Sequence, residues 1–414
     1  MAQQPVIPEA PMTSLPYIPF GRQTIDADDV AAVVEALQSN WLTTGPRVKQ
    51  FDQALALRVG AEYAACCSSG TAGLHLALMA LGIGPSDAVV VPSVTFLATA
   101  NAVRMVGARV IFTDVDPDTG LMRLEDLERV VAAPGAEQIK VVIPVHLNGQ
   151  CMDLAPFKAV AERIGAVIVE DGCHALGAAR ITDAGIVPVG ACQHSVMTVF
   201  SFHPTKNMTT GEGGAVTTND PALYRALTRL RSHGLVYEAE DHLYPEESRE
   251  ADGAAKPWYY EMARLGFNYR LNDFQCALGL SQLAKLDKMV AARQRLAVHY
   301  DQALVDLAPV VRPVTRISGS WPAWHIYVIL CDFDAIGLHR VRFMGRLREQ
   351  GVGSQVHYMP LYRHPYYRPT RQWPPMPGAE AYYQRCLSIP MFPDLSDLDQ
   401  ERVITTVRDV VGQR

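Results

Sequence analysis

The chain has 414 residues, which is long for one domain and fits one large domain plus a smaller one. Hydrophobic residues make up 49% of the chain and charged residues 19%, and no stretch approaches the roughly 18 uninterrupted apolar residues of a membrane helix. The net charge is −6, with Lys and Arg scattered along the chain. These values predict a soluble globular protein whose partners include neither a membrane nor nucleic acid.

The N-terminal stretch MAQQPVIPEAPMTSLPYIPF has proline and acid where a secretory signal needs a basic region and an apolar core. We therefore expect the protein in the cytoplasm. The eight cysteines form no CxxC pair and no Cys/His cluster of the zinc type, so we predict buried reduced thiols and no metal.

Short apolar runs alternate with segments of helical spacing, such as residues 154–164. The runs cover residues 89–91, 110–112, 141–145, 166–169 and 196–200. This alternation predicts βαβ units and therefore an α/β fold with a mostly parallel sheet. It fades after about residue 270, where a long helical stretch begins. We expect a large domain over residues 20–265 and a smaller C-terminal domain over residues 266–414, with residues 1–19 packing nearby.

A polar, acidic and proline-bounded segment, VYEAEDHLYPEESREADGAAKP, interrupts this pattern at residues 236–257. Its composition predicts an exposed excursion from the fold.

Ligands of such sheets bind beyond the carboxyl ends of the strands, so the residues after each run are candidates for chemistry. The stretch CSSGTAGLHLALMALG places small residues at the start of a helix near Gly70 and Thr71. Free backbone N–H groups there suit a phosphate at the positive end of the helix dipole. Taken alone, this stretch is more typical of an ordinary Ser/Thr cap.

The stretch VIVEDGCHALGA ends an apolar strand in Glu170 and Asp171. A carboxylate at a buried strand end is costly without a positive partner, so Asp171 is expected to face a cation or a set of donors. Capping of the next turn is the alternative. His174, taken alone, is typical of a structural histidine.

The stretch VFSFHPTKNMTTGEGGAVTTND places Lys206 after a strand, among hydroxyl and imidazole groups that include Ser201. A free lysine is protonated at neutral pH and is a poor nucleophile, but it becomes useful when bonded to an aldehyde or desolvated. Most single lysines in loops are surface residues, yet the following GEGG indicates close backbone approach. Further on, LGFNYRLND places Asn268 beside Arg270 and Asn272, and capping explains only Asn272.

A phosphate seat, an acid at a strand end and an isolated lysine are together what pyridoxal phosphate requires. These stretches, with SNWLTTGP, TFLATANA, RSHG and HYMPLY, resemble the DegT/StrS family of sugar-nucleotide aminotransferases from about Ile18 to the C-terminus. The resemblance implies pyridoxal phosphate fold type I, the aspartate aminotransferase-like fold. That fold has a large domain with a mostly parallel sheet and a smaller C-terminal α+β domain.

The resemblance also implies roles for individual residues. Lys206 and Asp171 are the expected catalytic pair: Lys206 forms the imine with the cofactor, and Asp171 pairs with its pyridine nitrogen. Asn268 is implied to reach the cofactor phosphate of a neighbouring subunit, which implies a homodimer with shared active sites. The remaining cofactor contacts are the phosphate ligands Gly70, Thr71 and Ser201, Phe96 stacked on the ring, and His174 near the phenolic oxygen.

Within the family, three stretches are most similar to the transaminases of pseudaminic acid biosynthesis: YIPFGRQTIDADDVAAVVEAL, SFHPTKNMTTGEGG and PWYYEMARLGFNYRLNDFQCALGLSQL. These enzymes aminate C4 of a UDP-linked 4-keto-6-deoxy-N-acetyl-hexosamine, with glutamate as the donor and pyridoxamine phosphate as the intermediate cofactor form. The product is UDP-4-amino-4,6-dideoxy-N-acetyl-β-L-altrosamine. The candidates for sugar-nucleotide contacts are Trp41, Thr43, His233, His325, His357 and Tyr358.

Several alternatives stay open at this point. His325 and His357 are equally well explained as core or capping histidines. The substrate is alternatively another nucleotide-linked 4-keto sugar, of the perosamine or 4-amino-4-deoxyarabinose type. A dehydratase of the same fold carries histidine at the lysine position, and Lys206 disfavours it. A sensor or regulator with this fold is disfavoured by the intact set of Lys206, Asp171 and Ser201.

Overall fold

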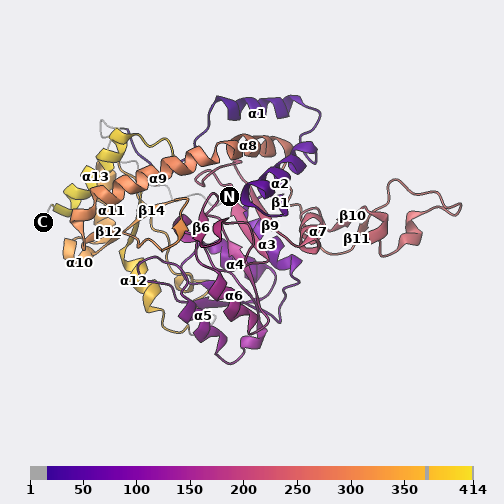
Figure 1. The fold of residues 1–414 in the computed structure, drawn as a ribbon, viewed down its shortest axis with the longest axis horizontal. Coiled ribbons are helices and arrows are strands. Elements are labelled where there is room, and N and C mark those ends of the chain that lie inside the picture. Colours follow the sequence, from indigo (N-terminus) through magenta and orange to yellow (C-terminus); the bar gives the residue numbers. More distant parts are fainter. Residues whose placement is uncertain (1–15, 369–372, 413–414) are drawn as a thin grey trace.

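The computed structural model describes residues 16–368 and 373–412. Its centre is a seven-stranded sheet in the order β1-β9-β8-β5-β4-β2-β3 (Figure 1). Every strand runs parallel to the others except β9, which is antiparallel to β1 and β8. The strands are β1 (Tyr63–Cys67), β2 (Ala88–Pro92), β3 (Arg109–Thr113), β4 (Ile139–Val142), β5 (Val167–Asp171), β8 (Met197–Ser201) and β9 (Gly214–Thr218).

The central strands are largely buried because helices cover the sheet. All five residues of β2 and of β9 are buried, as expected for strands with no face in water. The helices that alternate with these strands are α2 (Pro46–Val59), α3 (Gly70–Ala80), α4 (Leu97–Met105), α5 (Leu124–Val131), α6 (Ala155–Glu162) and α7 (Pro221–Leu230). The predicted apolar runs coincide with five of these strands, namely β2, β3, β4, β5 and β8, whereas β1 and β9 were not among them.

Two long helices connect the large sheet to the C-terminal part of the chain. Helix α8 (Asp273–Ala284) packs against α1 (Ala27–Gln38) and α2, and α9 (Leu286–Ala303) continues from it (Figure 1). Beyond them lies an antiparallel sheet in the order β12-β14-β15. Its elements are β12 (Val311–Pro313), β14 (Tyr327–Cys331), α10 (Phe333–Ile336), α11 (Arg340–Glu349), α12 (Pro377–Arg385), β15 (Cys386–Ile389) and α13 (Asp397–Gly412).

Two connections join the N-terminal and C-terminal halves of the chain. Strand β13 (Ser320–Trp321) pairs with β6 (Ala179–Thr182), which also pairs with β7 (Gly185–Pro188). The Ile18 N–H donates to the Gly351 carbonyl over 2.8 Å, and the Met391 N–H donates to the Phe20 carbonyl over 3.0 Å. The division at residues 265 and 266 stays a prediction, because α8 packs on α1 and α2 and the small sheet begins only at β12.

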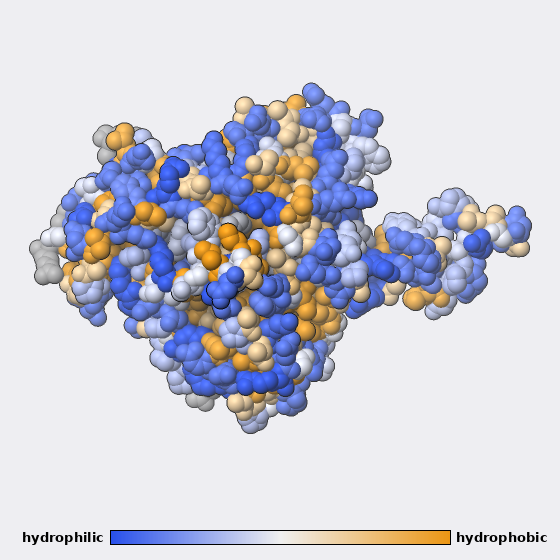
Figure 2. Space-filling model, in the orientation of Figure 1, coloured by the Kyte–Doolittle hydropathy of each residue, from blue (hydrophilic) through white to orange (hydrophobic). Residues whose placement is uncertain are grey.

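An arm extends from the body between α7 and α8, and we define it as residues 235–265. It contains the short pair β10 (Leu235–Val236) and β11 (Glu261–Met262), and it stands clear of the rest of the chain (Figures 1 and 2). The predicted excursion of residues 236–257 lies in this arm. Its exposed large apolar side chains are Tyr237, Leu243, Tyr244, Trp258, Tyr260, Met262 and Leu265.

Short 3-10 turns complete the fold: η1 (Ala136–Gln138), η2 (Leu147–Gly149), η3 (Ala239–Asp241), η4 (Pro245–Ser248), η5 (Val305–Leu307) and η6 (Leu361–Arg363). Within the ranges that the structure describes, every helix is too short or too polar to serve as a membrane span.

Candidate active site

A cavity of about 640 Å³ lies at the carboxyl ends of β5 and β8 and at the N-terminus of α3. The loop that contains His357 and Tyr358 closes its other side from the C-terminal half of the chain. Ten of the predicted site residues line this cavity: Gly70, Thr71, Phe96, Asp171, His174, Ser201, Lys206, His325, His357 and Tyr358.

One end of the cavity is formed by the first turn of α3. Ser69 caps this helix, because its side-chain oxygen accepts the Ala72 N–H over 3.1 Å. Helix geometry leaves the N–H groups of Gly70 and Thr71 without acceptors inside the helix. A side chain at Gly70 would lie 2.9 Å from the Ser201 Cβ, so only glycine lets the turn approach the end of β8 this closely. These donors and the Ser201 hydroxyl therefore converge on one small space that suits an anion.

Asp171 ends the central strand β5 and is 4% exposed. The Thr99 hydroxyl on α4 donates to its Oδ2 over 2.7 Å, and the Cys173 N–H donates to its Oδ1 over 3.1 Å. Thr95, one turn before Thr99, exchanges a hydrogen bond of 2.9 Å with the Thr99 hydroxyl. The carboxylate is thus fixed in orientation at the floor of the cavity, with a hydrogen-bond donor for each of its oxygens.

Lys206 follows β8 through a tight turn, in which its N–H donates to the His203 carbonyl over 2.9 Å. Its side chain lines the cavity, and its amino group makes no hydrogen bond to the described residues. Burial lowers the pKa of this amine, although the nearby Cys173 and Asp171 act in the opposite direction. At a given pH, more of the amine is therefore in the neutral, nucleophilic form than in an exposed lysine.

The loop that carries Lys206 is anchored from below by Asn207. Its side-chain amide donates to the Leu176 carbonyl over 2.9 Å and to the Ala323 carbonyl over 2.7 Å. Asn207 is 3% exposed and connects the lysine loop to both halves of the chain. Asn207 and Thr99 were not among the predicted site residues, and the only sequence signal for them is that each is a polar residue within one of the stretches SFHPTKNMTTGEGG and TFLATANA.

Three buried histidines form the opposite wall, namely His174, His325 and His357. The rings of His174 and His325 are 4.4 Å apart between centroids, and the Tyr358 hydroxyl lies 3.3 Å from the His174 Nε2. Burial lowers the pKa of all three, with the positive charge of Lys206 as a further cause, and brings the pKa of His357 to about 3. These imidazoles are therefore neutral at physiological pH.

Only some of the polar atoms of this wall have a hydrogen-bond partner. The Nδ1 atoms of His174 and His325 are buried without a hydrogen-bond partner in the described part of the chain. His357 is the exception, because its Nδ1 lies 2.7 Å from the Ser388 hydroxyl. Burial also raises the pKa of the Tyr358 hydroxyl, which keeps it protonated and able to donate.

Four of the predicted site residues do not line the cavity in the single chain. Trp41 and Thr43 are exposed in the connection between α1 and α2. His233 and Asn268 are exposed at the base of the arm, where they are brought together by a bridge between Ser232 and Asn268. Two positions 35 residues apart in sequence are therefore neighbours, outside the cavity of their own chain.

A family model described as the DegT/DnrJ/EryC1/StrS aminotransferase family matches residues 23–408. The chain belongs to this family. Its fold resembles that of a DegT DnrJ EryC1 StrS aminotransferase from Brucella abortus, with 33% identity, a TM-score of 0.81 and coverage of 93% of this chain and 96% of that chain. The predicted fold type I class and the assignment as a sugar aminotransferase are thereby confirmed.

Two further solved structures are similar at lower identity. One is Helicobacter pylori PseC, an aminotransferase involved in the biosynthesis of pseudoaminic acid, with 26% identity, a TM-score of 0.85 and coverage of 96% of this chain and 100% of that chain. The other is the putative sugar aminotransferase Spr1654 from Streptococcus pneumoniae in its PLP form, with 27% identity, a TM-score of 0.83 and coverage of 95% and 98%.

The family uses pyridoxal phosphate, which confirms the cofactor predicted from the sequence. The cavity fits this group on two observations. A buried carboxylate, Asp171, faces a lysine amine that has no hydrogen-bond partner among the described residues, and the donors at Gly70, Thr71 and Ser201 lie at one end of the same cavity. A phosphate, a basic ring nitrogen and an aldehyde would each meet a group of matching chemistry.

Proposed function

We propose that this aminotransferase moves an amino group from glutamate to C4 of a UDP-linked 4-keto-6-deoxy-N-acetyl-hexosamine. The product is UDP-4-amino-4,6-dideoxy-N-acetyl-β-L-altrosamine, a precursor of pseudaminic acid. The observation that carries the transaminase chemistry is the cavity in which Lys206 and the buried Asp171 lie together. Similarity to PseC over 96% of this chain supports the choice of sugar.

The cofactor-side residues divide the binding of pyridoxal phosphate among them. The N–H groups of Gly70 and Thr71 and the Ser201 hydroxyl hold the phosphate, and Phe96 covers one face of the ring. Asp171 accepts a hydrogen bond from the protonated ring nitrogen, and His174 lies beside the phenolic oxygen. Bound pyridoxal phosphate supplies an aldehyde that takes up amino groups and a ring that accepts the electron pair of a broken C–H bond.

Lys206 has two tasks in this scheme. Its amine holds the cofactor between turnovers, and once displaced by glutamate it moves the proton that leaves the amino-bearing carbon. The lowered pKa of Lys206 suits both tasks, because a neutral amine would be able to bond to the cofactor and to accept a proton. Asp171 keeps the ring nitrogen protonated, which stabilises negative charge as it develops near that carbon.

Within the wall of neutral histidines, His174 lies on the cofactor side, whereas His325 and the adjoining Tyr358 face the sugar. Tyr358 donates its hydroxyl proton, and His325 offers an imidazole nitrogen to sugar hydroxyl or carbonyl groups. Neutral imidazoles suit an uncharged keto sugar better than the diphosphate, which requires cations. Apart from Lys206, neither lysine nor arginine lines the cavity in the described part of the chain.

The shortage of cations supports a homodimer in which a second copy completes each site. Both the diphosphate of the sugar nucleotide and the carboxylates of glutamate need positive or donor groups. Asn268, His233, Trp41 and Thr43 are exposed outside their own cavity, where a partner copy would meet them. The exposed apolar side chains of the arm, together with Val30, Val34 and Leu37 on one face of α1, favour burial against that copy.

Mixing two inactive variants tests the shared site. Lys206→Ala chains and Asn268→Ala chains, each inactive alone, should regain about a quarter of normal activity after equal mixing and random subunit exchange. Half of the dimers are then mixed, and one of the two sites in each has both groups. Complete inactivity with exchange confirmed by differently tagged chains would show that each chain builds its site alone.

A substrate panel tests the sugar. The protein is incubated with glutamate and with UDP-, GDP- and dTDP-linked 4-keto sugars, and the amino sugar formed is identified by mass spectrometry and NMR. The expected product is the UDP-linked 4-amino-altrosamine derivative. Preferred turnover of a GDP-linked or 4-keto-pentose substrate would establish the perosamine or 4-amino-4-deoxyarabinose type instead. A cofactor absorbance band that does not change when glutamate is added would indicate a sensor.

A further inference from the structure

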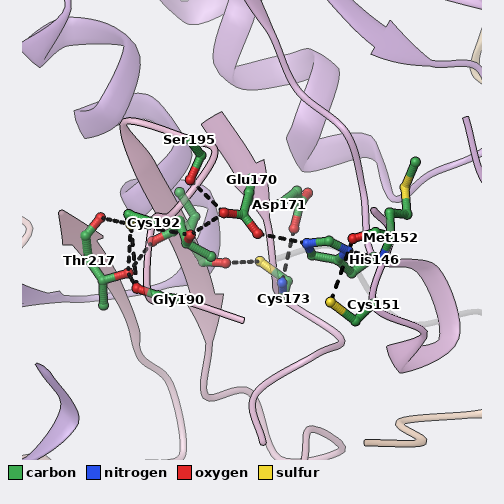
Figure 3. Close-up of polar contacts among 12 residues, drawn as sticks. His146, Cys151, Met152, Glu170, Asp171, Cys173, Gly190, Cys192, Ser195 and Thr217 are labelled. Atoms are coloured by element: carbon green, nitrogen blue, oxygen red, sulfur yellow. Dashed lines mark hydrogen bonds and ion pairs between the residues drawn. The ribbon is translucent and has the colours of Figure 1, made fainter. Parts of the chain in front are cut away.

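Glu170, the residue before Asp171, is a buried carboxylate for which the proposed mechanism has no role. It is 5% exposed and receives three hydrogen bonds (Figure 3). The His146 Nε2 lies 2.8 Å from its Oε2, the Thr198 hydroxyl lies 3.0 Å from its Oε1, and the Ser195 hydroxyl also donates to Oε1. These donors keep the pKa of Glu170 below its ordinary value even though burial acts in the opposite direction.

The donors come from both sides of β5. Thr198 lies on the neighbouring strand β8 in register with Glu170, and His146 follows β4 on the other side. Successive side chains of a strand point to opposite faces, so Glu170 lies on the face of the sheet opposite to Asp171. Glu170 thus links β8 and the segment after β4 through hydrogen bonds on the face of the sheet opposite to Asp171.

The tautomer of His146 is fixed by its second contact. Its Nδ1 accepts the Met152 N–H over 3.0 Å, so Nε2 must carry the proton and donate it to Glu170 (Figure 3). An imidazole with a carboxylate at one nitrogen and a backbone N–H at the other cannot flip its ring without losing both hydrogen bonds. The orientation of His146 therefore depends on the carboxylate of Glu170.

His146 in turn holds two parts of the cavity. Its backbone N–H donates to the Asp171 carbonyl over 3.1 Å. The turn η2 that follows it supplies carbonyls from Asn148 and Gly149, which accept the N–H groups of His325 and Ala323, each over 3.1 Å. A side chain at Gly149 would lie 2.5 Å from the Ala323 carbonyl oxygen, so this contact is as close as a backbone permits.

We propose that Glu170 is a positioning residue, which acts through His146 to set Asp171 on the cofactor side and His325 on the sugar side of the same cavity. This inference rests on the proposed roles of those two residues. Loss of the Glu170 charge releases His146 and shifts both. A displacement of about 1 Å in such groups costs roughly 100-fold in rate, so the effect is expected in both half-reactions.

Glu170→Gln is the principal test. The amide retains an oxygen for Ser195 and Thr198, but it presents an N–H to a histidine nitrogen that already carries a proton. We expect the glutamate and sugar half-reactions to slow alike, by about 10- to 100-fold, with smaller changes in KM. The affinity of the apoprotein for pyridoxal phosphate should fall about 10-fold, because Asp171 no longer meets the ring nitrogen squarely.

A matched control separates positioning from stability. Asp114 is also a buried carboxylate with a set of N–H donors, from Val115, Gly378 and Ala379, and it does not line the cavity. Asp114→Asn should lower the thermal midpoint as much as Glu170→Gln does, while leaving cofactor affinity and both half-reactions unchanged. If the two variants behave alike, Glu170 has only a structural role and the inference is overturned.

His146 provides a second test that remains informative if Glu170→Gln does not fold. In His146→Gln, the side-chain amide keeps a donor near Glu170, whereas His146→Leu loses it. We expect His146→Gln to retain most activity and His146→Leu to reproduce the slow half-reactions and the weak cofactor binding. Equal activity of the two variants would contradict the inference. Asp171→Asn, tested alongside, shows whether the proposed function itself fails.

Discussion

The cavity has a cofactor wall, formed by Gly70, Thr71, Asp171 and Ser201, and a histidine wall, formed by His174, His325 and His357. The two walls differ in how many of their polar groups have hydrogen-bond partners. In the cofactor wall, Asp171 has hydrogen bonds to both carboxylate oxygens, and the strands on either side of it are fastened through Glu170. In the histidine wall, His174 and His325 each keep a buried nitrogen without a partner in the described chain. The sheet fixes the polar groups of the cofactor wall before a ligand binds. In the histidine wall, a bound ligand supplies the missing hydrogen bonds.

The largest effect on activity is expected from a change at Lys206, which lines the same cavity as both walls. Lys206→Ala should abolish both half-reactions and leave the fold intact, because one amine carries both the bond to the cofactor and the proton transfer. Borohydride reduction of the loaded wild-type enzyme should attach the cofactor to the peptide that contains Lys206, as mass spectrometry would show. Attachment to any other lysine would overturn the assignment.

Asp171→Asn tests the preorganised wall. The amide is nearly the same shape and should still bind the cofactor, but it does not hold the ring nitrogen protonated. We expect both half-reactions to slow about 100- to 1,000-fold, in line with the loss of one electrostatic contact to developing charge. Stopped-flow absorbance of the cofactor measures each half-reaction. Turnover close to that of the wild type would eliminate this role for Asp171.

Tyr358→Phe tests the histidine wall and should separate the two half-reactions. The variant loses the hydroxyl that we propose donates to the sugar, so we expect the sugar half-reaction to slow about 10-fold, in keeping with one lost hydrogen bond. The glutamate half-reaction should stay close to normal. His325→Gln should show the same separation.

Tyr300→Phe is the matched control for this test. It removes a buried hydroxyl that donates to the Pro390 carbonyl away from the cavity, and it should change neither half-reaction. Equal losses in both half-reactions of Tyr358→Phe would assign Tyr358 to the fold or the cofactor.

The smallest effect concerns acid stability. The pKa of His357 is lowered by burial from 6.5 to about 3, so below pH 6.5 the unfolded chain binds a proton that the folded chain does not. Stability contributed by this site is therefore lost as the pH falls from 6.5 toward 3, by about 1.4 kcal/mol per pH unit.

In His357→Asn, the free energy of unfolding should fall less steeply between pH 6 and 4, by about 1.4 kcal/mol per pH unit. Urea titrations at each pH would measure this difference. His339→Asn, which replaces an exposed histidine in the same way, is the control. An unchanged slope in His357→Asn would mean that this imidazole titrates in the folded protein as it does in the unfolded chain.

The sequence predicted the cofactor wall better than the histidine wall for a physical reason. Parallel strands buried on both faces are recognisable as apolar runs, and their ends mark where Asp171, Ser201 and Lys206 gather. The partners of these residues come from other elements, and no local pattern indicates them. Thr99 on α4 is 72 positions from Asp171, and His146 is 24 positions from Glu170.

The four residues that lie outside the cavity illustrate a second limit. Trp41, Thr43, His233 and Asn268 are exposed in the single chain, and their roles stay predictions. A pattern in one sequence does not distinguish residues that serve their own chain from those that serve another copy. The exposed arm, in contrast, was predictable, because a polar, acidic and proline-bounded run that interrupts the alternation of strands and helices is typical of an exposed excursion.

The bridge between Ile18 and residues 351–353 has a consequence for biosynthesis. Phe20, which lines the cavity, is secured by the carbonyl contact to Met391, near the opposite end of the chain. The ribosome makes Met391 long after Phe20, so the segment around Phe20 stays without this partner while the residues between them are made. Contacts of such long sequence separation form slowly and leave intermediates exposed to aggregation.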